Sequence, residues 1–209
     1  MIATQNSLVN GLLPRASVNP LTRDVLLVAL GVALLAISAQ FKVPLGPVPV
    51  TLQALVVMLI GGVYGWRLGA VTVAAYVLDG IVLGAVAPAM PWFAGQNFIG
   101  YAFVGPTAGY LWGFIVAAGL IGFLSDSLNM RGNVITLFAA FMLGNFVIYA
   151  MGLGFAAAIY YPIIAEASHS FATVWGWFAG PFIIGDILKA VIATGLVFAG
   201  GAALQRIRG

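Results

Sequence analysis

Two ionisable residues of opposite charge stand in an otherwise apolar run near the end of the sequence. Asp186 and Lys189 lie in Gly-Pro-Phe-Ile-Ile-Gly-Asp-Ile-Leu-Lys-Ala, residues 180–190. A spacing of three places both side chains on one face of a helix. Because a charge at the centre of a bilayer costs roughly 2.5–3.5 kcal/mol on insertion scales, such residues usually face a cavity or a partner. Three interpretations stay open: a mutually neutralising structural pair, a lysine that snorkels to the outer interface, or a polar anchor for a ligand.

Uncharged polar side chains in apolar surroundings form a second set of candidates. Thr51 can cap a helix that begins after the proline-rich run, and Gln53 then lies in the first turn. At that depth the Gln53 amide could offer a donor and an acceptor to a ligand. Asn97 and Gln96 are amides in an apolar, irregular stretch, where they either bind a ligand or cap their own loop.

The other polar or aromatic residues are less specific. Tyr110 follows Gly-Pro-Thr-Ala-Gly and is either an interface residue or the wall of a pocket. Asp79 lies in the outer half of an apolar span, where it can bind a cation, pair with another helix or sit at the interface. Glu166 and His169 are expected in a solvated outer loop.

The composition shows what kind of molecule must position these residues. Hydrophobic residues make up 63% of the 209 residues and charged residues 6%, whereas a soluble domain carries roughly 25% charged residues. A transmembrane helix needs about 20 apolar residues. The sequence therefore predicts an all-α integral membrane protein, a bundle of about six transmembrane helices without a separate soluble domain.

Several classes of function are not expected from this composition. The chain has no cysteine and one histidine, so we predict no metal site and no cofactor. It has neither a Gly-rich phosphate loop nor a set of catalytic residues, so we predict no enzyme and no ATP hydrolysis by this chain. Its eight basic residues are spread along the sequence, which does not favour a nucleic-acid partner.

The apolar spans divide the chain into a tail and a membrane domain. Residues 1–22 are expected to be a cytoplasmic N-terminal tail, and residues 23–209 a six-helix substrate-binding domain. Residues 87–104, rich in Gly, Pro and aromatics, predict an irregular apolar segment between the third and fourth spans, held against the bundle. The six predicted spans are residues 25–41, 50–64, 68–86, 106–124, 134–161 and 181–204.

The basic residues predict the orientation of the bundle. With six spans, most of them fall on one side, which the positive-inside rule assigns to the cytoplasm. Both termini are then cytoplasmic, and Lys42 and Lys189 are the exceptions. The residues on the predicted cytoplasmic side are Arg15, Arg23, Arg67, Arg131, Arg206 and Arg208.

Four motifs occur in a specific order. They are Pro-Val-Pro-Val-Thr-Leu-Gln (47–53), Phe-Ala-Gly (93–95), Gly-Pro-Thr-x-Gly-Tyr (105–110) and Pro-Phe-x-x-Gly-Asp-x-x-Lys-Ala (181–190). Each is weak alone, but together they resemble the BioY family, the biotin-specific substrate-binding component of energy-coupling-factor transporters. The resemblance covers about residues 25–205.

The resemblance implies high-affinity biotin binding and uptake across the bacterial cytoplasmic membrane. The partners it implies are a transmembrane coupling protein and two cytoplasmic ATPase subunits, beside the lipid bilayer, and biotin is the transported ligand. Ala29 and Ala33 form a small-xxx-small face, which packs within the chain or, as in the family, docks the coupling protein.

Biotin has an apolar ring and chain, a carboxylate and a ureido group, so its pocket should be mostly apolar with few polar groups. Lys189 can neutralise the carboxylate, and Asp186 can accept ureido N–H bonds or position Lys189. Asn97 and Gln53 are candidates for the remaining polar end. Trp92, Phe93 and Tyr110 are candidates for the wall around the ring. Which end of biotin meets Lys189 stays open.

Three other functions are open at this point. The same architecture could serve another vitamin. An intramembrane enzyme would need paired catalytic groups, which the sequence lacks. A self-sufficient secondary carrier would use Asp79 or Asp186 as its proton site.

Overall fold

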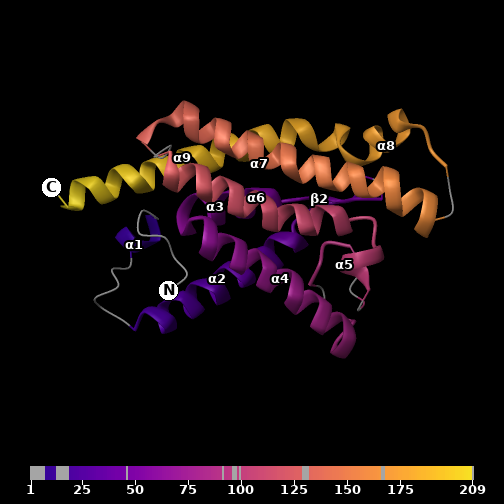
Figure 1. The fold of residues 1–209 in the computed structure, drawn as a ribbon, viewed down its shortest axis with the longest axis horizontal. Helices are drawn as coiled ribbons and strands as arrows, with labels where there is room; N and C mark the ends of the chain where they lie inside the picture. Colours follow the sequence, from indigo (N-terminus) through magenta and orange to yellow (C-terminus); the bar gives the residue numbers. More distant parts are fainter. Residues whose placement is uncertain are drawn as a thin grey trace.

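The computed structural model describes residues 8–12, 19–45, 47–90, 92–95, 98, 100–128, 132–165 and 168–208, and these residues form an almost entirely helical bundle (Figure 1). Its elements, in chain order, are α1 (Leu8–Leu12), α2 (Pro20–Gln40), β1 (Lys42–Val43), β2 (Val50–Thr51), α3 (Gln53–Tyr64), α4 (Trp66–Val86), α5 (Tyr101–Val104), α6 (Ala108–Ser127), α7 (Val134–Phe155), a π-helix (Ala156–Ile164), α8 (Phe171–Phe178), a 3-10 turn (Gly180–Phe182) and α9 (Ile183–Arg208).

Five helical stretches of the described chain are long and apolar enough to cross a membrane, and α3 is a shorter apolar helix. The prediction of an all-α membrane bundle is therefore confirmed. Large apolar side chains such as Leu26, Leu30 and Ile184 face outward, as expected where the surroundings are lipid. The five stretches are Pro20–Gln40, Trp66–Val86, Ala108–Ser127, Val134–Ile164 and Phe171–Leu204.

The short helix α3 is bounded by its own sequence. Before it, Val43 and Val50 pair in the antiparallel hairpin of β1 and β2, across a connection that contains three prolines. After it, Gly65 has a φ of 81°, a left-handed conformation that suits glycine and separates α3 from α4. With a rise of about 1.5 Å per residue, the twelve residues of α3 span only part of the membrane.

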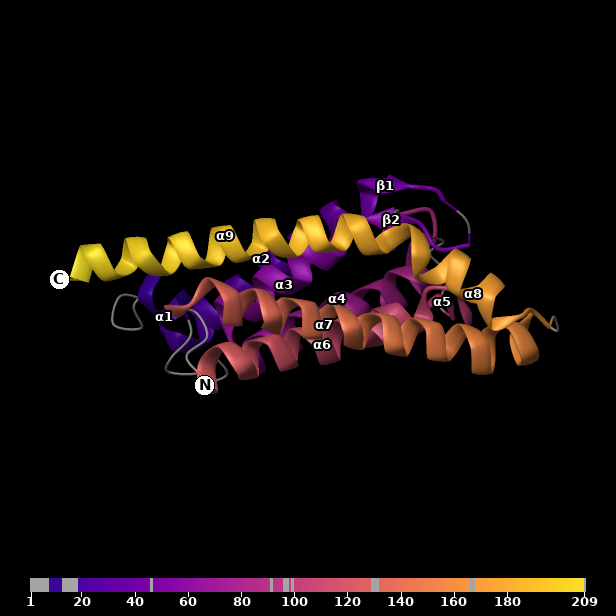
Figure 2. The ribbon, with the colours of Figure 1, turned by 90° about the horizontal axis from the view of Figure 1, so that it is seen from above.

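Helix α6 lies at the centre of the bundle and contacts α3, α4 and α7. Helix α9 packs against α3 and α7, and α2 packs against α4 and α3. Figures 1 and 2 place α1 and the C-terminal end of α9 at one end of the bundle. Both views place the hairpin, α5 and α8 at the opposite end.

Some element boundaries differ from those expected. Helix α2 begins at Pro20 rather than near residue 25, because the Asn19 side chain accepts a hydrogen bond from the Leu21 amide and Pro20 suits the first turn. Within the expected tail, α1 packs against α3 and α9 and buries Val9. Residues 162–178, which lie between the fifth and sixth predicted spans, include the end of the π-helix and α8.

Candidate ligand-binding site

A cavity lies where the hairpin, α3, α6, α7 and α9 converge. Together with the open space at its mouth it spans about 560 Å³. Most of its walls are apolar, and polar groups converge at one end. It is lined by Val48, Pro49, Thr51, Gln53, Ala54, Phe93, Ala94, Thr107, Tyr110, Leu111, Phe114, Ile148, Tyr149, Phe182, Asp186 and Lys189.

The Asp186–Lys189 pair lies on the cavity wall, in the first two turns of α9. The Lys189 ammonium donates to Asp186 Oδ1 over 2.6 Å, and each side chain is only 10% exposed. The pair is therefore an intramolecular ion pair inside the bundle. Lys189 does not snorkel to the membrane surface.

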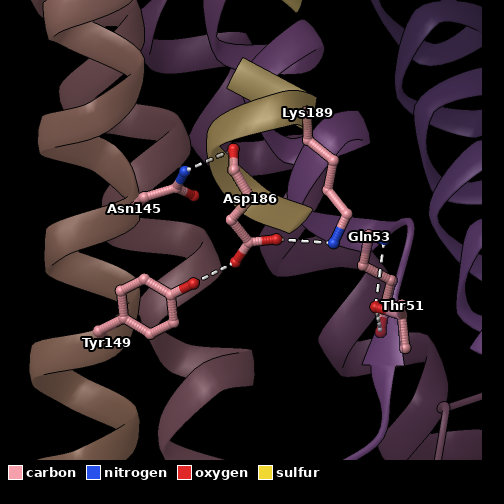
Figure 3. A network of polar contacts seen from close by, with 6 residues as sticks. All are labelled: Thr51, Gln53, Asn145, Tyr149, Asp186 and Lys189. Atoms are coloured by element: carbon pink, nitrogen blue, oxygen red, sulfur yellow. Dashed lines mark hydrogen bonds and ion pairs between the residues drawn. The ribbon is translucent and has the colours of Figure 1, made fainter. Parts of the chain in front are cut away.

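A second helix holds Asp186 from the other side. The Tyr149 hydroxyl on α7 donates to Asp186 Oδ2, and the Asn145 amide donates to the Asp186 backbone carbonyl over 3.5 Å (Figure 3). The sequence interpretation did not single out Asn145 or Tyr149. Asn145 could have been found from the sequence, because a polar amide within an apolar span usually has a hydrogen-bond partner. Tyr149 lies one turn further along the same face of the helix.

Gln53 lines the cavity from the start of α3, and its amide is already hydrogen-bonded on both atoms. Its Nε2 donates to the Tyr76 hydroxyl over 3.0 Å, and its Oε1 accepts from the Thr51 hydroxyl over 3.3 Å. The Tyr76 hydroxyl in turn donates to the Trp92 carbonyl over 3.1 Å. Gln53 thus links the base of the hairpin to the segment at residues 92–95. The prediction that Thr51 caps this helix is wrong. Leu52 is the N-cap of α3 and makes no side-chain cap hydrogen bond, because Thr51 lies one residue earlier and its hydroxyl accepts from the Gln53 backbone N–H.

Phe93 reaches the cavity because α4 leaves room for its ring. A Cβ added at Gly80 would lie 2.1 Å from Phe93 Cζ, so only glycine permits this approach. The Lys42 ammonium donates to the Ala94 carbonyl over 2.7 Å and ties the same segment to the hairpin. Trp92 does not line the cavity. Its indole stacks on Tyr76 and donates to the Tyr76 carbonyl over 3.0 Å.

Tyr110 and Phe182 form an aromatic wall of the cavity. Their ring centroids lie 6.4 Å apart, and the Tyr110 ring also stacks on that of Phe178. The Tyr110 hydroxyl donates to the Phe178 carbonyl. The Tyr110 hydroxyl hydrogen is therefore used in this bond to α8, and the Tyr110 ring contributes an apolar surface to the cavity.

The remaining candidates lie elsewhere. Asn97 and Gln96 fall outside the described residues, as does Glu166. Asp79 is exposed on α4 and is not among the residues that line the cavity. His169 is exposed and packs edge-on against Tyr161 and Trp177.

Ala29 and Ala33 are exposed on the outer face of α2, and Gly31 between them packs inward on Thr72. The small-residue face thus faces away from the bundle. Within the described part of the chain, no group of three histidine, cysteine or acidic residues is arranged to hold a metal ion.

Comparison with known proteins gives consistent matches over most of the chain. The family model described as "BioY family" matches residues 6–206. A protein of Thermotoga maritima named "Biotin transporter BioY" is 39% identical over 165 residues, covering 78% of this chain and 86% of the relative. A protein of the same name from Rhizobium etli is 37% identical over 184 residues, covering 83% and 90%.

A solved structure shares the fold. The crystal structure described as the "S-component for biotin from an ECF-type ABC transporter" superposes with a TM-score of 0.71 at 24% sequence identity. The superposition covers 87% of this chain and 92% of that chain.

Proposed function

This chain belongs to the BioY family, and on that premise we propose that it binds biotin and serves as the substrate-specific component of an ATP-driven vitamin transporter. The observation that carries the proposal is the cavity itself. Its walls are mainly apolar, and Lys189, Asp186 and Tyr149 converge at one end.

This arrangement matches the chemistry of biotin. An apolar bicyclic ring and an aliphatic chain need walls such as Phe93, Tyr110 and Phe182. A ureido group with N–H donors and a carbonyl needs a small set of fixed polar partners. Gln53, Asp186 and Lys189 line the cavity, and we propose that each of them either contacts the ligand or positions a side chain that does.

The cavity lies beside the hairpin, and α1 and the end of α9 lie at the other end of the bundle. We assign the hairpin end to the outer side of the bacterial cytoplasmic membrane and both termini to the cytoplasm. Arg23 and Arg67, at the starts of α2 and α4, support this orientation under the positive-inside rule. Biotin then enters from outside.

In this proposal the energy for release comes from other subunits. We propose that a transmembrane coupling protein docks on α2, where Ala29 and Ala33 expose a small-residue face, and that two cytoplasmic ATPases act through it. Residues 23–209 were expected to form the substrate-binding domain. Because α2 begins at Pro20, we propose that this domain also includes Pro20, Leu21 and Thr22.

A secondary carrier is the alternative that uses the same cavity. The two mechanisms are distinguished by measuring uptake of radiolabelled biotin in a host strain that lacks its own biotin transporter and any coupling module. The proposal predicts ATP-dependent accumulation when the coupling protein and ATPases are co-expressed with this chain. Accumulation against a gradient by this chain alone, abolished by Asp186→Asn and by dissipating the proton gradient, would instead support the secondary carrier.

A further inference from the structure

The two carboxylate oxygens of Asp186 each accept a hydrogen bond from the protein. Lys189 donates to Oδ1 from within α9, and Tyr149 donates to Oδ2 from α7 (Figure 3). Asp186 thus orients both side chains at once. Its position makes it a positioning residue for the groups that meet the ligand.

The bond to Asp186 fixes what Tyr149 can offer. A tyrosine hydroxyl carries one hydrogen, and this one is donated to the carboxylate. What remains are lone pairs on an oxygen of a residue that lines the cavity, so Tyr149 can only accept. Lys189 is its complement, because an ammonium has three hydrogens and no acceptor, and the described residues supply one acceptor for it.

The charges point to a neutral ligand group at this end. Lys189 is already neutralised by Asp186 at 2.6 Å, and an incoming carboxylate would meet the negative Asp186 as well as the ammonium. A cyclic urea avoids this repulsion. It carries an N–H donor directly beside a carbonyl acceptor, which matches an acceptor on Tyr149 beside a donor on Lys189.

We propose that Tyr149 is a specificity-determining residue of the biotin site: its hydroxyl oxygen accepts a ureido N–H while Lys189 donates to the ureido carbonyl. The inference rests on the proposed function, since it presumes that biotin occupies the cavity. It assigns the ureido ring to the Asp186 end and the carboxylate tail to the opposite part of the cavity.

The test combines one substitution with a ligand of nearly unchanged shape. Calorimetry on the purified full chain compares biotin with its two ring-carbamate isosteres, in each of which a ring oxygen replaces one ureido N–H. In the unmodified chain, one isostere should bind at least tenfold more weakly than biotin, because the Tyr149 oxygen then faces another oxygen. In Tyr149→Phe, biotin should bind about tenfold more weakly, and its advantage over that isostere should fall below threefold.

Tyr160→Phe is the matched control. It removes the same hydroxyl from the same helical span at a residue that does not line the cavity, and it should keep the unmodified pattern. An unchanged preference for biotin over the isostere in Tyr149→Phe would overturn the inference. If Tyr149→Phe does not fold, the titrations of the unmodified chain test the inference without it. Affinities of that chain for both isosteres within threefold of its affinity for biotin would also overturn the inference. Absence of biotin binding to the unmodified chain would instead refute the proposed function.

Discussion

Lys189 and Asp186 lie one helical turn apart on α9 and form an ion pair of 2.6 Å, with each side chain 10% exposed. Burying two charges is costly, and such a pair is seldom justified by stability alone, because apolar replacements are often as stable. Its place on the wall of the cavity is the reason why we propose a role for it in ligand binding.

Lys189→Met should weaken biotin roughly tenfold to a hundredfold, because a hydrogen bond to a charged group contributes about 1.5–3 kcal/mol. Methionine keeps the length and the apolar stem. Biotin amide, which lacks the carboxylate, should lose affinity by the same factor, since we place the ureido ring at Lys189. Calorimetry with both ligands measures this, and a loss confined to biotin would place the carboxylate there instead.

A purely structural pair predicts a different pattern. Each single variant would then be unstable because it strands a buried charge, while the double variant Lys189→Met, Asp186→Leu would be stable. Thermal unfolding and biotin titration of the double variant separate the two interpretations. Normal biotin affinity in that protein would remove both residues from the binding site.

Gly80→Ala should disturb the cavity from behind Phe93. The added Cβ would lie 2.1 Å from Phe93 Cζ and 2.6 Å from Trp92 Cδ1, and overpacking of this kind costs about 1–3 kcal/mol. Lower thermal stability and weaker biotin binding are both expected. Gly195→Ala on α9 is the matched control, because nothing lies within 4 Å of its new Cβ. Equal thermal stability and equal biotin affinity of the two variants would argue that the contact with Gly80 does not hold Phe93 in place.

Ala29→Leu and Ala33→Leu should impair assembly and leave biotin binding intact. Both alanines are exposed on α2, and leucine there would hold a partner helix further away. Co-purification with the coupling module should fall severalfold, while calorimetry on the isolated chain should be unchanged. Ala158→Leu is the control, because Ala158 is also exposed and lies on the π-helix. Intact co-purification of both α2 variants would refute the docking role.

The C-terminus should lie in the cytoplasm, as the distribution of arginines predicts. Fusion of a fluorescent protein that matures only in the cytoplasm after residue 209 should give fluorescent cells. A periplasmic phosphatase fused at the same position should stay inactive. Active phosphatase with dark fluorescent fusions would reverse the orientation and place the cavity mouth on the inner side.

The membrane spans could be predicted because apolar length and scarce charge are properties of the chain alone. The Asp186–Lys189 pair could be predicted for the same reason, since three residues of separation already place both on one face of a helix. The contacts from Asn145 and Tyr149 are different, because they join α7 to α9. In a lipid-facing helix both faces are apolar, so periodicity does not tell which tyrosine faces a cavity.

Three other features could not be predicted from hydropathy, because they depend on local hydrogen bonds and backbone conformation. The start of α2 at Pro20 depends on a single cap by Asn19, a signal that an apolar window overlooks. The π-helix at Ala156–Ile164 includes Pro162 within an apolar run, and hydropathy does not distinguish it from an α-helix. Trp92 was expected at the ring of biotin, but its indole is held by the Tyr76 carbonyl, and Phe93 lines the cavity.

The most direct measurement is calorimetric titration of the detergent-solubilised, purified chain with biotin, without ATP and without other subunits. The account predicts saturable binding at about one site per chain, which excess desthiobiotin abolishes. Absence of saturable heat at high micromolar biotin, with a folded protein, would contradict it.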